Sequence, residues 1–139
     1  MLSYNLAKLV IVCAALAPFA SAFDVAYSVY PDATLGFPAC GATPNESGTF
    51  ASGTTGAPGC QNIPTSYYGQ FKLAANAPVG CVLNFFTGTN CGGTQNAGLI
   101  IPIPLEPGVQ TGCATIYATQ LSITDPKVPG MSLQVVCPA

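Results

Sequence analysis

The sequence predicts a small all-β domain cross-linked by disulfides, either a sandwich or a partly closed barrel. Three observations predict this fold class. The 139 residues include 15 glycines and 13 prolines, which interrupt helices, and no stretch of a dozen residues has a helical period. Short runs in which apolar residues alternate with polar ones are frequent instead, as in half-buried strands. Six of the seven cysteines follow residue 22, a density typical of small disulfide-bonded domains.

Residues 1–22 have the pattern of a secretory signal peptide. Lys8 precedes the apolar run 9–16, and Ala20-Ser21-Ala22 supplies the small residues of a cleavage site. The apolar run is shorter than the roughly 20 residues that a membrane span needs. We therefore expect a secreted, extracellular protein without a membrane span, in which residues 23–139 form a single disulfide-rich domain.

Alternation of apolar and polar residues predicts the strands. They are expected at residues 23–30, 67–73, 81–86, 113–123 and 131–137. The last two are expected to form an antiparallel hairpin, because residues 125–130 between them contain two prolines and a glycine. Segment 99–105 contains Pro102 and Pro104, which cannot donate ladder hydrogen bonds, so we expect it at a sheet edge.

Residues 41–59 lack an apolar alternation and are rich in glycine, proline, serine and threonine. A long exposed loop is therefore expected between Cys40 and Cys60. It contains Asn45-Glu46-Ser47, a glycosylation acceptor. We expect an N-linked glycan on Asn45 if the protein is secreted by a eukaryotic route.

Three disulfides, with 15 conceivable pairings, are expected among Cys40, Cys60, Cys81, Cys91, Cys113 and Cys137. Zinc favours closely spaced cysteine pairs, often with histidine, and neither is present here. In a hairpin centred near Asp125, Cys113 and Cys137 come opposite each other, within disulfide range. The remaining bridges would then be Cys40–Cys60 and Cys81–Cys91, each closing a local loop, although interleaved pairings stay open.

The charge pattern excludes several classes of function. Beyond residue 22 the chain has two lysines, five carboxylates and neither arginine nor histidine, which gives a net charge of −3. Two lysines are too few to form the basic surface that binds the phosphates of a nucleic acid. The absence of histidine removes the usual catalytic base and the commonest metal ligand. We therefore expect no catalytic residue, no metal and no cofactor.

One catalytic alternative remains, a small glycoside hydrolase that uses two carboxylates across a cleft. The candidate carboxylates are Asp24, Asp32, Glu46, Glu106 and Asp125. Most of them lie beside prolines or in the expected loop, where carboxylates are usually solvated or accept hydrogen bonds from backbone amides.

Tyrosines near amide side chains are the candidates for a binding surface, because they offer an aromatic face together with a polar tip. These are Tyr67, Tyr68, Tyr27 and Tyr30. Alternation along a regular strand would place Tyr67 and Tyr68 on opposite faces, so one ring is expected in the core and the other at the surface. Tyrosine is also a common half-buried strand residue, and core or rim packing is the simpler interpretation for each of the four.

Residues 86–93 resemble the folded hairpin of the βγ-crystallin Greek key, in which a turn follows an aromatic residue and ends near a glycine. Phe86 matches the aromatic position and Gly93 the glycine, whereas Cys91 stands where that family has a second aromatic residue. The calcium-binding signature of the family has no counterpart here. The resemblance implies a Greek-key sandwich without a calcium site; the simpler interpretation is a β-turn pinned by a Cys81–Cys91 disulfide.

The chain beyond residue 22 is similar as a whole to the small secreted cysteine-rich proteins of filamentous fungi. These proteins share a signal peptide, one compact domain, spaced cysteines and an uncharged polar surface. Many of them are effectors, elicitors or antimicrobial toxins. The resemblance implies an effector- or elicitor-like virulence protein that acts on a host or a competitor, through an extracellular protein or glycan as partner. We expect a monomer, and the main rival interpretation is a cell-wall or glycan-binding module.

Overall fold

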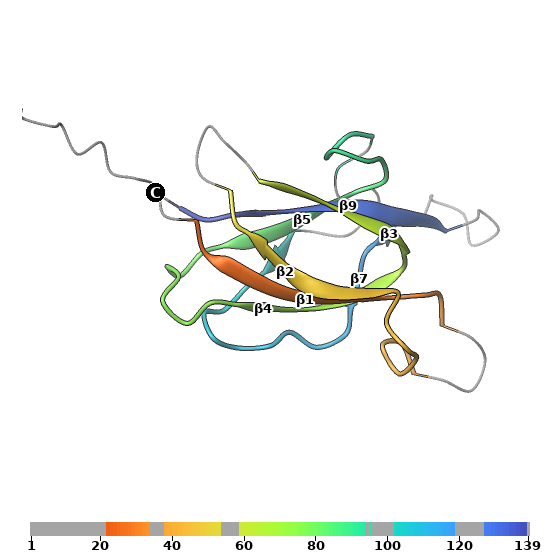
Figure 1. Cartoon of the computed structure of the whole chain (residues 1–139), viewed down its shortest axis with the longest axis horizontal. Coiled ribbons are helices and arrows are strands. Elements are labelled where there is room, and N and C mark those ends of the chain that lie inside the picture. Colours follow the sequence, from red (N-terminus) through yellow and green to blue (C-terminus); the bar gives the residue numbers. More distant parts are fainter. Residues whose placement is uncertain are drawn as a thin grey trace, which may run out of the picture.

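The computed structural model describes residues 22–33, 38–53, 59–93, 95, 102–118 and 127–138. In these residues the protein is all-β, with two antiparallel sheets and no helix. The sheets pack face to face as a small sandwich and are not closed into a barrel (Figure 1). Residues 1–21 of the predicted signal peptide lie outside the described part of the chain.

The first sheet has four strands in the order β2-β1-β4-β7. They are β2 (Glu46–Ala51), β1 (Asp24–Tyr30), β4 (Tyr68–Leu73) and β7 (Ala114–Thr115). In the central pair, Val25 lies opposite Leu73 and Tyr27 lies opposite Phe71. All four of these side chains are buried, so alternate residues of β1 and β4 face the second sheet.

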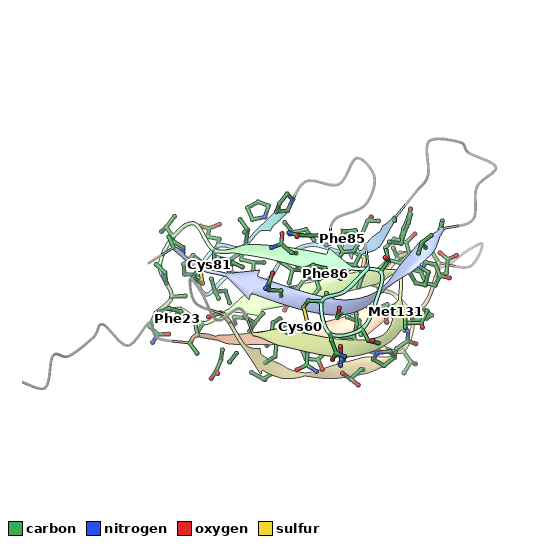
Figure 2. All side chains as sticks on the ribbon, turned by 90° about the horizontal axis from the view of Figure 1, so that it is seen from above. Phe23, Cys60, Cys81, Phe85, Phe86 and Met131 are labelled. Atoms are coloured by element: carbon green, nitrogen blue, oxygen red, sulfur yellow. A yellow bond between two sulfur atoms is a disulfide. The ribbon has the colours of Figure 1, made fainter. Side chains whose placement is uncertain are left out.

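The second sheet has five strands, ordered β3-β9-β5-β6, with β8 also paired to β9. They are β3 (Cys60–Ser66), β9 (Val128–Val136), β5 (Val82–Phe86), β6 (Ile103–Pro104) and β8 (Tyr117–Ala118). Successive residues of β5 face opposite ways: Phe85 lies in the core, and Phe86 lies on the outer face opposite Ser132 (Figure 2). The strand β9 pairs with three neighbours and is the centre of this sheet.

The hydrophobic core lies between the two sheets. Its fully buried apolar side chains include Val25, Val29, Phe71, Leu73, Leu83, Phe85, Ile116, Leu133 and Val135. Burying one side chain of this size contributes about 1.5–3 kcal/mol. Within the described residues, every buried side-chain nitrogen or oxygen has a hydrogen-bond partner. In the described residues, the contact between the sheets therefore buries apolar surface without leaving a side-chain nitrogen or oxygen unsatisfied.

Four predicted strands are confirmed near their expected positions, as β1, β4, β5 and β9. The proline-rich segment also behaves as expected, because β6 is the edge strand next to β5. Residues 99–101 of that segment lie outside the described residues.

The expectation of a long loop at 41–59 is wrong in part, because this segment contains β2. Phe50 of β2 is buried and contacts the Tyr27 ring edge-on, with ring centroids 5.5 Å apart. Tyr27 also lies opposite Gly48, where a Cβ would come within 3.3 Å of the tyrosine ring. Phe50 is thus the only buried side chain of an edge strand that is otherwise polar or small and pairs with β1 along its whole length.

The strand β3 has no counterpart among the predicted strands. Its only buried apolar side chain is Ile63, so it shows no alternation. Its pairing with β9 is irregular between Asn62 and Ser66, and Pro64 lies in that interval. A proline without a ladder donor is tolerated at such an irregularity on an edge strand.

The predicted C-terminal hairpin forms only at its tip, where β8 pairs with β9. At Ile116 the chain crosses between the sheets, and β7 pairs with β4 rather than with β9. The expected turn residue Asp125 lies outside the described residues. Because of the crossing, Cys113 precedes a strand of the first sheet and does not lie opposite Cys137.

The three disulfides join segments that are far apart in the sequence, and they are Cys40–Cys113, Cys60–Cys91 and Cys81–Cys137. The prediction that all six cysteines form disulfides is confirmed. The predicted pairings are all wrong, and they were Cys113–Cys137, Cys40–Cys60 and Cys81–Cys91. Because Cys91 pairs with Cys60, the interpretation of residues 86–93 as a turn pinned by a Cys81–Cys91 disulfide is also wrong.

The register explains the observed pairing of Cys137. Val82 on β5 lies opposite Val136 on β9, and one step further Cys81 meets Cys137. The partner of Cys137 is therefore the residue that immediately precedes β5 and not one from the segment before β7. The bridge Cys60–Cys91 passes over β9, which lies between β3 and β5. The bridge Cys40–Cys113 joins the connection between β1 and β2 to the segment before β7.

Candidate binding surface

Three tyrosines, a lysine and an aspartate are in contact with one another at one end of the sandwich. It is the end at which β1 ends and β4 begins. We call this cluster the tyrosine surface, and its members are Tyr67, Tyr68, Tyr117, Lys127 and Asp32. Asp32 follows β1, and Tyr67 and Tyr68 lie at the β3–β4 junction. Tyr117 begins β8 and Lys127 immediately precedes β9. The cluster therefore draws on both sheets.

Tyr117 lies between the other two rings. Its centroid is 6.1 Å from that of Tyr67, with the rings tilted by 53°, and 5.7 Å from that of Tyr68 in an edge-to-face contact. Such contacts are favourable and fix the orientation of each ring. All three side chains are half-buried, so part of each ring is packed and part meets solvent.

The charged pair of this surface is Lys127 and Asp32. The Lys127 Nζ donates to Asp32 Oδ1 at 2.9 Å and lies 4.8 Å from the centroid of the Tyr117 ring. The hydrogen bond to Asp32 raises the pKa of Lys127. Both charged groups are more than a third exposed, so the pair contributes only about 0–1 kcal/mol to stability. Their charges offset each other and leave the tyrosine surface close to neutral.

Burial raises the pKa of Tyr68, and a hydrogen bond with Tyr117 adds to the effect. The Tyr68 hydroxyl is therefore protonated at neutral pH, as an uncharged donor and acceptor. The surface can thus offer aromatic faces and neutral hydroxyl groups. This chemistry suits an uncharged, hydrogen-bonding partner rather than an ionic one.

The two other candidate tyrosines lie outside this cluster. Tyr30 is 7% exposed and donates to Gln70 Oε1 at 3.0 Å. Tyr27 is equally buried and donates to the Glu46 carboxylate. Burial and this carboxylate raise the pKa of Tyr27 to about 12. Both residues hold the first sheet together.

The expectation that Tyr67 and Tyr68 divide between core and surface is wrong, because both are half-buried. Tyr67 is the bend residue between β3 and β4, where strand alternation does not apply. Sequence reasoning also missed Tyr117 and Lys127. Tyr117 lies in the predicted strand 113–123, but nothing in the sequence reveals that the chain crosses between sheets just before it.

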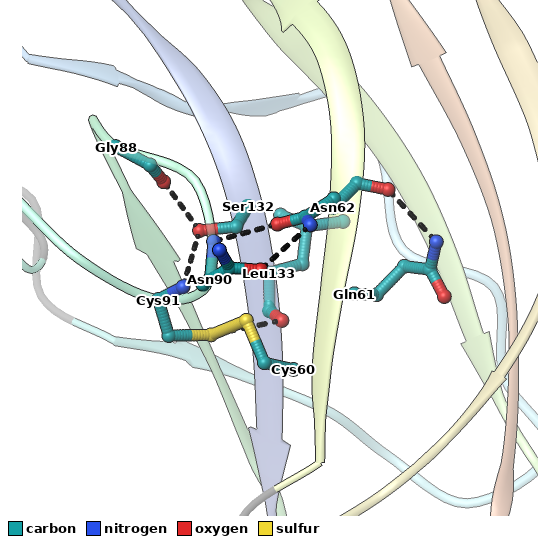
Figure 3. The surroundings of a disulfide bond; sticks show 8 residues. All are labelled: Cys60, Gln61, Asn62, Gly88, Asn90, Cys91, Ser132 and Leu133. Atoms are coloured by element: carbon teal, nitrogen blue, oxygen red, sulfur yellow. Dashed lines mark hydrogen bonds between the residues drawn. A yellow bond between two sulfur atoms is a disulfide. The ribbon is translucent and has the colours of Figure 1, made fainter.

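A second constrained region is the turn at residues 87–93, on the outer face of the second sheet. The disulfide Cys60–Cys91 ties this turn to β3 (Figure 3). Asn62 and Asn90 add two reciprocal hydrogen bonds. The Asn62 side-chain amide donates to Asn90 Oδ1 at 2.9 Å, and the Asn90 backbone N–H donates to Asn62 Oδ1 at 2.7 Å. Asn90 and Cys91 have φ values of 55° and 53°, so the turn is tight and left-handed at this point.

Ser132 of β9 lies under this turn and is fully buried. Its hydroxyl donates to the Gly88 carbonyl at 2.6 Å and accepts from the Cys91 N–H at 2.9 Å (Figure 3). Phe86 is also buried on this face. The turn therefore covers the outer face of the second sheet. Its disulfide and hydrogen bonds are explained by this structural role.

The carboxylates of the hydrolase alternative are dispersed or engaged. Asp24 is the first residue of β1, and Asp32 lies just after the end of this strand. At the rise of an extended chain, the two carboxylates are therefore roughly 25 Å apart. Paired carboxylates of glycosidases lie about 5–10 Å apart. Asp32 is bound by Lys127, and Glu46 by Tyr27. Glu106 is exposed, and the remaining candidate at 125 lies outside the described residues.

Within the described part of the chain, no group of three or more cysteine, histidine, aspartate or glutamate side chains is arranged to hold a metal ion. The same residues include no helix that is long and apolar enough to cross a membrane.

No model of a known protein family matches this chain, and neither a curated protein nor a solved structure matches it. A proposal for its function therefore depends on the chemistry of the tyrosine surface and on the disulfide framework around it.

Proposed function

We propose that this protein is a secreted, effector- or elicitor-like protein that acts outside the cell by binding a molecule of a host or a competitor through the tyrosine surface. The observation that carries the proposal is the contact of Tyr117 with both Tyr67 and Tyr68 at one end of the sandwich. Tyrosine is enriched among the residues that dominate binding energy at protein interfaces. Its ring supplies contact area with few rotatable bonds to immobilise.

The disulfide framework supports an extracellular role. Three bridges link segments that are 31 to 73 residues apart, in a domain with few charged groups. Bridges of this kind persist in oxidising compartments outside the cytosol. They also suppress local openings through which proteases attack. A molecule of this build suits persistence in an extracellular fluid.

The test is a response assay with the purified, oxidised protein. We expect the protein to trigger an oxidative burst in infiltrated leaf tissue or to inhibit the growth of competing microorganisms. The reduced and alkylated form should be inactive, because the tyrosine surface requires both sheets to be docked. Absence of any response from the oxidised protein, or full activity of the alkylated form, would contradict the proposal.

A glycan-binding module is the second candidate, and the outer face of β4 favours it. Tyr68 and Gln70 are two residues apart on this strand, so an aromatic ring and an amide share one face. Retention of the protein on insoluble chitin, glucan or cellulose separates this candidate from the first. Specific retention that soluble oligosaccharide reverses would favour the glycan-binding module.

A hydrolase would behave differently in the same assays. Single replacements of the carboxylates outside the tyrosine surface, Asp24→Asn, Glu46→Gln, Glu106→Gln and Asp125→Asn, should leave the response unchanged in folded protein. If one of them abolishes the response while the fold is intact, the protein is an enzyme and the binding proposal fails.

A further inference from the structure

Asn45 forms a bridge between the two sheets at the end that carries the tyrosine surface. It immediately precedes β2 and is exposed, and its backbone N–H donates to the Val29 carbonyl at 2.7 Å. Its side-chain Nδ2 donates to the Thr65 carbonyl and to the Ser66 hydroxyl, each at 3.2 Å. Ser66 ends β3 of the second sheet. The amide therefore connects the start of one edge strand to the end of another.

The rest of the acceptor sequence is also placed at the surface. Glu46 accepts a hydrogen bond from Tyr27, and the Ser47 side chain is exposed and lies 2.7 Å from the Ser28 hydroxyl. The acceptor serine therefore faces outward on β2. Thr65 and Ser66, which accept the hydrogen bonds of the Asn45 amide, come directly before Tyr67 in the sequence. A group attached to Asn45 would accordingly lie beside the tyrosine surface.

We propose that Asn45 carries an N-linked oligosaccharide and that its linkage amide remains a hydrogen-bond donor to β3. In the attachment step, a bond forms between Nδ2 and the anomeric carbon of a lipid-linked pyrophosphate sugar. The pyrophosphate carrier leaves, and Nδ2 loses one of its two protons. The remaining N–H is able to serve the Thr65 carbonyl or the Ser66 hydroxyl, so modification keeps part of the bridge. This inference depends on the secretory route of the proposed function, and it adds a modification site to it.

The first experiment expresses the full chain in a eukaryotic secretory host that makes high-mannose N-glycans and compares intact masses before and after treatment with endoglycosidase H. The variants are Asn45→Gln and Ser47→Ala, with Ser47→Thr as the matched control that keeps an acceptor. We expect a mass shift in the wild type and in Ser47→Thr, and none in the other two. A wild type without a glycan overturns the proposal.

The location of an unmodified protein separates the two proposals. An unmodified protein in the medium contradicts glycosylation alone and leaves secretion intact. An unmodified protein retained in the cytosol contradicts both.

The second experiment tests the role of the linkage amide. Endoglycosidase H leaves one sugar and the Asn45 amide in place, whereas peptide-N-glycosidase F converts the residue to aspartate, whose carboxylate cannot donate to the Thr65 carbonyl. We expect the aspartate form to unfold about 4 °C lower than the trimmed form, as the loss of one hydrogen bond implies. Equal midpoints would show that the amide has no such role.

Discussion

The rings of Tyr68 and Tyr117 lie 5.7 Å apart, although Tyr68 begins a strand of the first sheet and Tyr117 begins a strand of the second. This contact exists because the chain crosses between the sheets at Ile116. The Ile116 side chain is fully buried, and its N–H donates to the Tyr67 carbonyl at 2.9 Å. The tyrosine surface therefore forms only when the two sheets are packed together, and any change that separates the sheets also separates its tyrosines.

Gly69→Ala should destabilise the protein by about 1–3 kcal/mol, because overpacking a filled core forces neighbouring side chains from their preferred positions. A Cβ at Gly69 would lie 2.5 Å from Phe71 Cζ, and Phe71 is fully buried. The control is Gly112→Ala, since a Cβ at Gly112 has no neighbour within 4 Å. Urea denaturation of both variants checks the difference. Equal midpoints for the two would contradict the packing described for Phe71.

Ser132→Ala should cost about 1–3 kcal/mol, because it removes two hydrogen bonds and leaves the Cys91 N–H and the Gly88 carbonyl without their partner. Ser28→Ala is the matched control, since the Ser28 hydroxyl pairs with Ser47 at the surface and its loss should change stability by no more than about 0.5 kcal/mol. Hydrogen exchange should also accelerate at Cys91 in the first variant only. Unchanged protection there would mean that Ser132 does not hold the turn.

Replacing both Cys81 and Cys137 by alanine should destabilise the protein more than the same change at Cys60 and Cys91. Loop closure alone predicts about 4 kcal/mol for each bridge, since their separations of 56 and 31 residues differ little in chain entropy. Cys81 and Cys137 are also buried in the core, so their replacement leaves a cavity as well. Denaturant unfolding of the two double variants decides the order, and the reverse order would contradict the burial of Cys81–Cys137.

The pKa of Tyr27, about 12 in the folded protein, predicts an alkaline limit to stability. This value lies above the ordinary value of 10.0, so the stabilisation from protonated Tyr27 is complete below pH 10 and is lost as the pH rises through 12. Ultraviolet titration of the wild type and of Tyr27→Phe gives the step that belongs to Tyr27. We expect that step near pH 12. If the step that Tyr27→Phe removes lies near pH 10 instead, the burial of Tyr27 and its hydrogen bond to Glu46 do not raise its pKa, and the prediction is wrong.

Much of the fold follows from local pattern, because β1, β4, β5 and β9 each bury one face or lie in the centre of a sheet. Alternation marks such strands. The edge strands β2 and β3 bury little beyond Phe50 and Ile63, so their sequences look like loops. The disulfide pairing could not be derived, because it depends on which sheet each segment joins, and no local pattern encodes the crossing at Ile116.

The binding surface was predicted only in part, for the same reason. Tyr67 and Tyr68 are adjacent in the sequence and were identifiable as candidates. Tyr117 contacts Tyr68 across 49 residues of chain, and Lys127 joins the cluster through the Tyr117 ring and through Asp32. These contacts form only when the two sheets are docked. Tyr27 and Tyr30 were candidates by type alone, and packing assigns them to the sheet.

The central claim, that the protein acts by binding through the tyrosine surface, is tested most directly by Tyr117→Ala in the response assay. Val79→Ala is the control, because Val79 is 84% exposed and lies outside the tyrosine surface. Both variants are first shown to be folded, with three intact disulfides. We expect Tyr117→Ala to need at least about tenfold more protein for the same response, as the truncation of a central tyrosine at an interface implies, and Val79→Ala to match the wild type. A folded Tyr117→Ala with an unchanged dose–response curve would contradict the claim.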